Sequence, residues 1–107
     1  MNYFNQINEI EEKEVLPGFH GRMLHLAGFT IAYWRIEKGS ILPAHAHIHE
    51  QLSQVTSGEF EMTVDGETQI CVAGKVVTIP SQVVHSGKAL TDCTIIDVFQ
   101  PVREDYK

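Results

Sequence analysis

Three of the six histidines in this 107-residue chain fall within five residues of one another, in the stretch PAHAHIHEQ at 43–51. Imidazole is the commonest protein ligand for divalent metals such as zinc, iron, nickel and copper. Two histidines separated by one residue on a strand point to the same side, so His45 and His47 can bind one ion together. Gln51 shares their parity, and its amide oxygen is a weaker, neutral ligand. The stretch predicts a metal site, with a solvated histidine-rich turn as the alternative.

Two neighbouring residues leave the ligand set open. His49 has the same parity as the other two histidines, so it is either a residue that orients a ligand or an alternative ligand. Glu50 would replace Gln51 as a ligand if the strand bulged at this point. His20 and His25 are expected to be ordinary strand or surface residues.

The composition is that of one soluble, acidic domain. A chain of 12.0 kDa can bury enough surface to fold without disulfides. Its net charge of -6 opposes binding to nucleic acid or anionic membranes. No apolar run reaches the ~20 residues of a membrane span and no signal sequence is visible, so we expect a cytoplasmic protein. Cys71 and Cys93 lack the spacing of a metal or redox pair and are expected to be reduced.

Alternation of apolar and polar residues predicts strands along most of the chain, and no helical stripe persists. Asp65-Gly66 between two alternating segments predicts a tight hairpin. Residues 1–16 form an acid-rich amino-terminal arm, expected to be either loose or an edge strand that docks onto a neighbour. Short strands at this density predict an all-β barrel whose mouth holds the site. The strands are expected at 19–26, 29–36, 52–56, 59–64, 67–72, 76–79, 83–86 and 94–99.

The spacing of the histidines is similar to two sequence motifs of the cupin family. The first motif is resembled by Gly39, five residues, His45-Ala46-His47, three residues, Gln51, six residues and Gly58, with Gln51 in place of the usual glutamate. The second is resembled by Gly74, five residues, Pro80 and, five positions on, His85. Gln82 stands where that motif has a glycine, and Ala89 where it often has an asparagine.

This resemblance implies a single-domain cupin jelly-roll β-barrel over residues 1–107, with its core at 29–99. It also implies one divalent metal ion, with nickel, zinc, iron, manganese and copper all compatible with imidazole and amide ligands. Taken alone, His85 would be a hydrogen-bonded core histidine, whereas the paired motifs make it a ligand. The implied ligands are His45, His47, Gln51 and His85.

The carboxyl end carries a narrower resemblance. The sequence IDVFQPVREDY at 96–106, together with HIHEQ at 47–51, is similar to the small pectin-degradation cupins of the KdgF type, and the likeness extends over 29–106. Those proteins are mononuclear metal enzymes that convert 4,5-unsaturated uronates, released by pectate and alginate lyases, into linear ketonised sugar acids. The resemblance implies catalytic roles for Asp97, Phe99 and Arg103.

The chemistry of these residues leaves two pairs of alternatives. Asp97 lies on one of two largely apolar faces of the last predicted strand, so it is either solvated or faces a polar cavity. Arg103 is either a bidentate clamp for a substrate carboxylate or an exposed ion pair with Glu104 or Asp105.

The leading hypothesis is a metal-dependent enzyme acting on a small sugar acid. The metal polarises an oxygen of an unsaturated uronate, Asp97 moves a proton as an enol becomes a ketone, Arg103 holds the carboxylate and Phe99 shapes an apolar wall. One alternative is a dioxygenase with Fe(II), which oxygen consumption would reveal. Another is a sugar-binding cupin without turnover. No DNA-binding helices accompany the domain, so regulation in cis is not expected.

We also expect a homodimer. The arm carries Tyr3, Phe4, Ile7 and Ile10, apolar groups that a barrel of this size cannot cover alone, and sheet edges commonly pair between subunits.

Overall fold

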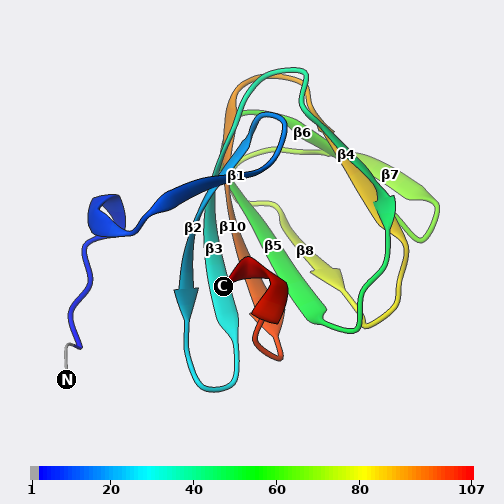
Figure 1. Cartoon of the computed structure of the whole chain (residues 1–107). Coiled ribbons are helices and arrows are strands. Elements are labelled where there is room, and N and C mark those ends of the chain that lie inside the picture. Colours follow the sequence, from blue (N-terminus) through cyan, green and yellow to red (C-terminus); the bar gives the residue numbers. More distant parts are fainter. Residues whose placement is uncertain (1–2) are drawn as a thin grey trace.

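The computed structural model describes residues 3–107, which form ten strands and two short 3-10 helices (Figure 1). Met1 and Asn2 of the predicted arm lie outside the described residues. The helices are η1 (Ile7–Glu9) and η2 (Glu104–Tyr106). The strands are β1 (Glu12–Leu16), β2 (Phe19–His25), β3 (Thr30–Ile36), β4 (Ile41–His45), β5 (Glu50–Ser57), β6 (Phe60–Val64), β7 (Glu67–Cys71), β8 (Val76–Ile79), β9 (His85–Ala89) and β10 (Cys93–Gln100).

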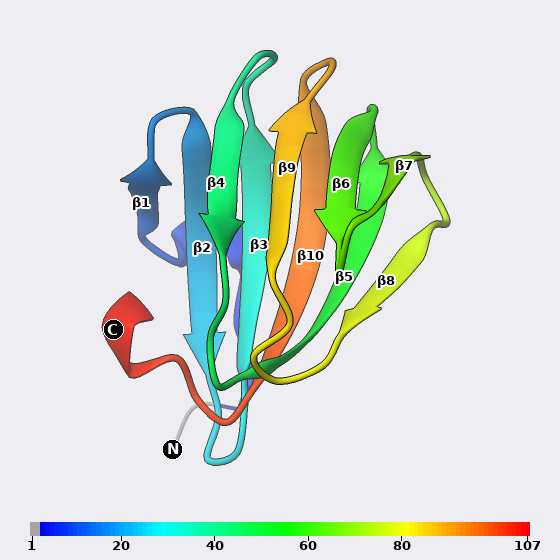
Figure 2. The same ribbon diagram turned by 90° about the vertical axis from the view of Figure 1, so that its right-hand side faces the viewer.

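Two antiparallel sheets face each other (Figure 2). One has the strand order β1-β2-β3-β10-β5-β8 and the other the order β4-β9-β6-β7. The expected all-β jelly-roll arrangement is confirmed, but the expected closed barrel is wrong, since the described strands pair only within their own sheet. The chain passes from the larger sheet to the smaller between β5 and β6. Gly58 there has a φ of +80°, and a Cβ on it would collide with the backbone of Asp92 and Cys93, so this connection requires glycine.

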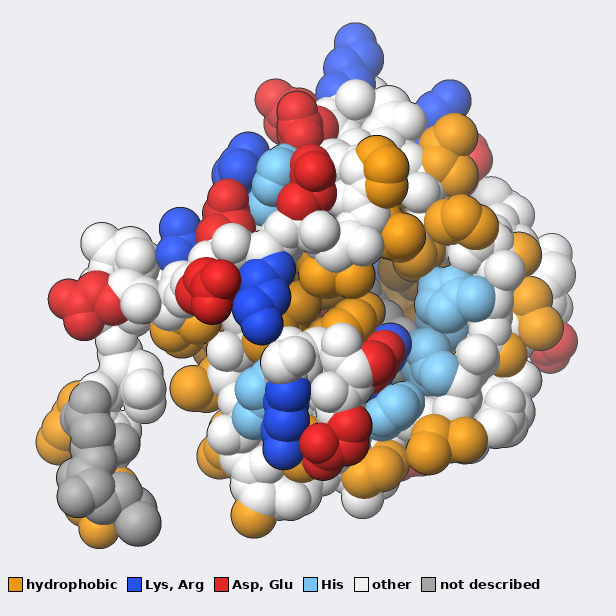
Figure 3. Space-filling view, in the orientation of Figure 1, with side chains coloured by type: hydrophobic (Ala, Val, Ile, Leu, Met, Phe, Trp, Pro, Cys, Tyr) orange, Lys and Arg blue, Asp and Glu red, His pale blue; other side chains and the backbone are white. Residues whose placement is uncertain are grey.

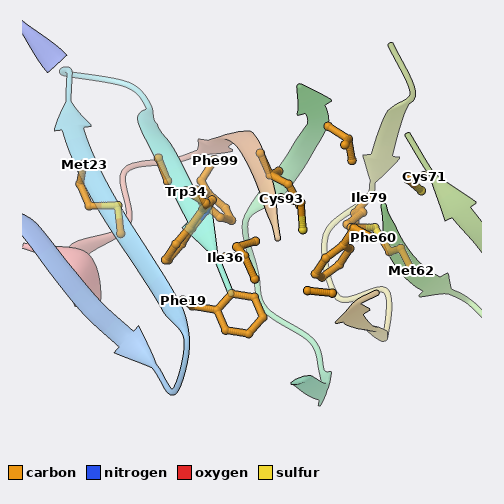
Figure 4. Close-up of a cluster of buried hydrophobic side chains, with 14 residues drawn as sticks. Phe19, Met23, Trp34, Ile36, Phe60, Met62, Cys71, Ile79, Cys93 and Phe99 are labelled. Carbon is orange, nitrogen blue, oxygen red and sulfur yellow. The ribbon is translucent and has the colours of Figure 1, made fainter. Parts of the chain in front are cut away.

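The core lies between the sheets and follows the alternation of the strands. In β3, Thr30, Ala32, Trp34 and Ile36 point inward, as their common parity predicts. Phe19 packs edge-to-face against Trp34 and Phe60, with ring centroids 6.3 and 6.4 Å apart (Figure 4). These aromatic contacts join the six-stranded sheet to the four-stranded one.

The eight expected strands are present, most with ends that differ by one or two residues and β9 with a larger shift, whereas β4 was not predicted. β1 forms the outer edge of the larger sheet, which confirms the edge-strand alternative for the end of the arm. β4 and β9 pair with each other and carry the histidines; β9 begins where the predicted strand 83–86 was expected to end. In the part of the chain that the structure describes, no helix has the length and apolar character needed to cross a membrane.

Candidate metal and substrate site

The predicted histidines converge at one end of the space between the sheets. His45 is the last residue of β4, His85 is the first of β9, and the two are paired across the strands. Their ring centroids are 4.2 Å apart, and the His47 ring lies 4.9 Å from that of His85. One ring nitrogen from each of the three lies within 4.8 Å of the others. His45 and His47 lie together as predicted, but the predicted route through alternation on one strand is wrong, because β4 ends at His45 and His47 belongs to the loop that follows.

Backbone carbonyls orient all three rings. A carbonyl oxygen only accepts, so each Nδ1 must carry the proton, and the neutral ring then presents the lone pair of Nε2. Hydrogen bonds of this kind commonly fix the tautomer of metal-binding histidines. The three bonds run from His45 to Pro43 (2.8 Å), from His47 to His49 (3.0 Å) and from His85 to Val83 (2.9 Å).

The Nε2 atoms form a donor set that suits a divalent cation. Nε2 of His85 is buried without a hydrogen-bond partner. Nε2 of His47 lies 3.1 Å from Oε1 of Gln51. Burial lowers the pKa of His47 and of His85, so both rings are neutral near pH 7. The lone pair on Nε2 of His47 therefore faces a lone pair on Oε1 of Gln51. Such groups are normally satisfied, and a metal ion satisfies them all at once, so the residues present fit one.

The two open alternatives for the ligand set are answered by the geometry. Gln51 is buried, whereas Glu50 is exposed, and the pairing with β10 runs without a bulge through both residues. Glu50 therefore points away from the histidines. The ring of His49 packs edge-to-face on that of His47 at 5.5 Å but is outside the nitrogen cluster, and its carbonyl orients His47. His49 therefore lies beside the nitrogen cluster and orients one of its members through its backbone carbonyl, while its own Nδ1 is buried without a hydrogen-bond partner.

A cavity continues from the histidines into the space between the sheets, and Figure 3 shows its hydrophobic floor behind a rim of histidine and charged side chains. It offers about 50 Å³ to the centres of water molecules. One water needs roughly 10–15 Å³ by this measure, so the cavity has room for a few waters or for one end of a small organic molecule. Gln51, His85, Asp97, Phe99 and Arg103 all line it.

Asp97 faces the cavity, as one of the two alternatives predicted. Its Oδ2 accepts a hydrogen bond from Nε1 of Trp34 over 2.9 Å. Its Oδ1 is buried without a partner, as is Oγ of Ser53, which is directly opposite on β5. Burial raises the pKa of Asp97 to about 6, although the nearby donors of Ser53, Gln51 and Trp34 oppose the shift.

Arg103 combines features of both predicted alternatives. It forms a bidentate ion pair with Asp105, with Nε–Oδ1 and Nη2–Oδ2 distances of 2.9 and 2.7 Å. The ion pair was expected to be exposed, but Arg103 is 8% exposed and lines the cavity. Its guanidinium carbon lies 4.7 Å from the ring centre of Phe99 and 4.1 Å from that of Tyr106. The two rings are nearly perpendicular, with centres 5.7 Å apart, and form an aromatic corner in which the guanidinium lies.

Three residues of the site were missed by sequence reasoning. Trp34 and Ser53 have the inward parity of core residues, and nothing local distinguishes a buried donor from ordinary packing. Tyr106 follows the last strand, and its ring contacts Phe99 and Trp34 at 5.7 and 6.0 Å. His20 and His25 are half-buried strand residues on β2 outside the histidine cluster; His20 pairs with Glu37 at 2.8 Å.

Comparison with known proteins agrees with this architecture. A solved cupin described as RmlC-like, from Shewanella frigidimarina, is 30% identical, with a TM-score of 0.94 over 100% of this chain and 97% of its own. The structure of KdgF from a Halomonas species is 26% identical, with a TM-score of 0.92 over 100% of both chains. Salicylate 1,2-dioxygenase from Pseudoaminobacter salicylatoxidans, 19% identical with a TM-score of 0.76, shares the fold over 80% of this chain and 27% of its own.

Sequence comparison points the same way. The pectin degradation protein KdgF of Dickeya dadantii is 34% identical over 71 residues, which are 64% of this chain and 64% of that protein. The chain thus matches less than two thirds of the length of this relative. The family model described as a cupin domain matches residues 32–99, which include both histidine motifs. The chain belongs to the cupin family.

Proposed function

We propose that this cupin is a metal-dependent enzyme that converts 4,5-unsaturated uronates from pectin or alginate breakdown into linear ketonised products. The observation that carries the proposal is the position of Asp97, a buried carboxyl with a pKa of about 6, in one cavity with the histidine cluster and Arg103. The likeness to two KdgF proteins supports the choice of substrate class.

His45, His47 and His85, with the amide oxygen of Gln51, would hold one divalent ion. When bound, the ion supplies a Lewis acid that polarises an oxygen of the substrate. The protein's part is to present four neutral ligand atoms, three of them already oriented by backbone hydrogen bonds.

Asp97 handles the proton. An acid or base works best with a pKa near the working pH, and a value of about 6 meets this condition. Because Trp34 occupies Oδ2, the free Oδ1 is the atom that accepts a proton and returns it as the enol becomes a ketone. The surrounding apolar side chains keep bulk water from competing for that proton.

Arg103 and Phe99 position the substrate. The guanidinium of Arg103 is the cation that a uronate carboxylate requires in a protein of net charge -6. The ring of Phe99 contacts both Arg103 and His47, the latter at 5.9 Å between ring centres. Phe99 therefore forms the wall between the carboxylate site and the histidines.

The test is incubation of the metal-loaded protein with lyase-generated unsaturated uronate, while the ultraviolet absorbance of the conjugated double bond is followed. We expect the absorbance to fall, and to fall roughly 100- to 10,000-fold more slowly with Asp97→Asn, since a positioned acid or base contributes that much. Arg103→Ala should chiefly raise KM, and both variants should keep the metal. Near-normal rates in both would remove Asp97 and Arg103 from the mechanism.

The same experiment separates the alternatives. Oxygen consumption during turnover would identify a dioxygenase, which the fold shared with salicylate 1,2-dioxygenase does not by itself indicate. A uronate that binds and is recovered unchanged would identify a sugar-binding cupin.

We further propose that the chain is a homodimer. The arm projects from the body in Figure 1, with Tyr3 76% and Ile7 47% exposed. Arg22 anchors the base of the arm by donating to the carbonyl of Ile10. On the outer face of the larger sheet, cross-strand pairing aligns an apolar row that a second copy can cover. The row consists of Leu24, Ile31, Val98 and Leu52.

The mass in solution tests this proposal. We expect a dimer at micromolar concentration by light scattering, and a shift towards monomer in Leu52→Ser, which lies in the row and is exposed. A monomeric wild type at these concentrations would contradict the proposal.

A further inference from the structure

We propose that Asp105 is a positioning residue, whose carboxylate holds one edge of Arg103 so that the other end of the guanidinium is presented to an anionic ligand in the cavity. The identity of that ligand, a uronate carboxylate, rests on the function proposed above. Asp105 itself touches neither the histidine cluster nor Asp97 in the described contacts, so any effect it has must pass through Arg103.

The ion pair fixes the plane of the guanidinium. Asp105 takes both Nε and Nη2, the side-on edge of the planar fork, at 2.9 and 2.7 Å. The end of the fork, Nη1 with the second hydrogen of Nη2, is not used by Asp105; the hydroxyl of Tyr106 also lies within hydrogen-bonding reach of the guanidinium. A substrate carboxylate can bind this end through two parallel hydrogen bonds while Asp105 keeps its own.

Other contacts fix the remaining freedom of Arg103. Phe99 and Tyr106 form a corner around the guanidinium, since their rings are nearly perpendicular and their centres are 5.7 Å apart. The backbone N–H of Arg103 donates to Oγ1 of Thr30 over 3.0 Å, and this hydroxyl is 2.9 Å from Nδ1 of His25. The side chain is therefore held at its base by Thr30, in a corner by two rings and along one edge by Asp105. Of these contacts, the ion pair with Asp105 is the one that engages a defined edge of the fork.

The charge of Asp105 has a second consequence. Arg103 and Asp97 line the same cavity, and a buried carboxylate attracts an unrestrained guanidinium strongly. Such a pairing would occupy Oδ1 of Asp97, the atom assigned to the proton. The Asp105 side chain is 59% exposed, so it binds Arg103 from the solvent side. In this way Asp105 keeps the guanidinium away from Oδ1 of Asp97.

A structural role and a positioning role can be separated. Because the Arg103 side chain is only 10% exposed, removal of the Asp105 carboxylate leaves a largely buried cation without its partner and should lower stability, so the fold and metal content of each variant are checked before ligand affinities are compared. The effect of its removal should appear in ligand affinity.

The experiment is a double-mutant cycle on metal-loaded full-length protein: wild type, Asp105→Ala, Arg103→Ala and the double variant. One readout is the Kd of galacturonate, a saturated uronate, by calorimetry, and the other is KM and kcat for the unsaturated uronate. We expect Asp105→Ala to raise Kd and KM roughly tenfold, a coupling usual for contacting residues, and to have no further effect once Arg103 is absent. Asp105→Asn, which keeps one acceptor, should lie between wild type and Asp105→Ala.

A matched control is available in the same turn. Glu104→Gln removes a neighbouring carboxylate whose partner is Lys107, and it should leave all readouts unchanged. The proposal is overturned if Asp105→Ala leaves Kd and KM as they are, tightens binding, or has the same effect with and without Arg103. A wild type that binds galacturonate but does not act on the unsaturated sugar would refute the proposed function alone, and the cycle in Kd would still decide the role of Asp105. A wild type that binds neither sugar would overturn both.

Discussion

The indole N–H of Trp34 donates to Oδ2 of Asp97 over 2.9 Å, and both residues are buried between the sheets. The two are diagonal neighbours on adjacent strands, since Trp34 is paired with Ile95 and Asp97 with Ala32. This bond favours the charged carboxylate and selects which of its oxygens is free. The aromatic core of the sandwich is thus also the support of the proposed proton carrier.

Replacement of Trp34 by Phe should therefore change the pH profile. Loss of the indole donor raises the pKa of Asp97 further. Because Asp97 must be deprotonated to accept the enol proton, the acidic limb of the pH profile of kcat/KM should then move to higher pH. The measurement is the pH dependence of kcat/KM. Ile36→Val, which loses core volume without a hydrogen bond, is the control, and equal profiles for the two variants would contradict the assignment.

The free energy of unfolding of the metal-free protein should fall as the pH rises above 3.8, the usual pKa of an aspartate carboxyl. Well below pH 3.8, its usual pKa, Asp97 is neutral in both the folded and the unfolded state. As the pH rises from 3.8 towards about 6 the unfolded chain ionises first, so the folded state loses stability, and the loss levels off once the pH is well above 6. At about 1.4 kcal/mol per unit, the loss amounts to about 3 kcal/mol. Asp97→Asn should abolish it, which thermal unfolding at pH 4 and pH 7 would show; equal pH dependence in both proteins would contradict it.

Gln82 should be replaceable by Gly with a gain in stability. Gln82 stands where the second cupin motif has a glycine, and its φ is +66°, a left-handed conformation that costs a residue with a side chain roughly 1–2 kcal/mol. Gly avoids this cost but loses more entropy on folding, so a net gain of about 0.5–1 kcal/mol is expected. Denaturant unfolding measures it. Gln82→Ala, which keeps a Cβ, should show no such gain, and equal gains in both would exclude the backbone explanation.

Metal binding should distinguish His47, a member of the nitrogen cluster, from His49, which lies beside it. His47→Ala removes a ligand atom and should abolish stoichiometric binding of a divalent ion while most of the fold remains. His49→Ala should retain the ion, because the carbonyl of residue 49, which orients His47, is unchanged by the substitution. Elemental analysis after purification without chelators provides the measurement. Metal loss in both variants would place His49 among the ligands.

Much of the fold could be predicted because its strands alternate cleanly. β3 and β10 bury every second residue, and the parity that placed Trp34 and Asp97 inward is the parity observed. β4 escaped prediction, and β1 was predicted only as one alternative for the arm, because both are edge strands without a fully buried residue, and Pro43 interrupts the pattern in β4. β9 reads HSGKA, a polar sequence whose Gly87 lies under the ring of Phe60, where a Cβ would collide.

The site was predictable to the extent that it follows motif spacing. The three histidines and Gln51 were named as a set, and the structure brings them together. The loop after β4 places His47 beside His45 and His85, and its path depends on contacts across the fold. One of these is the hydrogen bond from the backbone N–H of Gln82 to the carbonyl of His47, at 2.7 Å. Spacing alone could not choose between a ligand clamp and an ion pair for Arg103 either, because the answer depends on where Asp105 lies.

The ligand set draws on both sheets. Gln51 belongs to the larger sheet, His45 and His85 to the smaller, and among the described strands no ladder joins the two. An ion held by these residues would therefore act as a cross-link at the end of the sandwich where the sheets are otherwise united only by loops and side-chain packing. Free metal at a hundredfold excess over its Kd stabilises a folded protein by about 2.7 kcal/mol. A cell short of the metal would then hold less of this protein, because the apoprotein unfolds and is degraded more often.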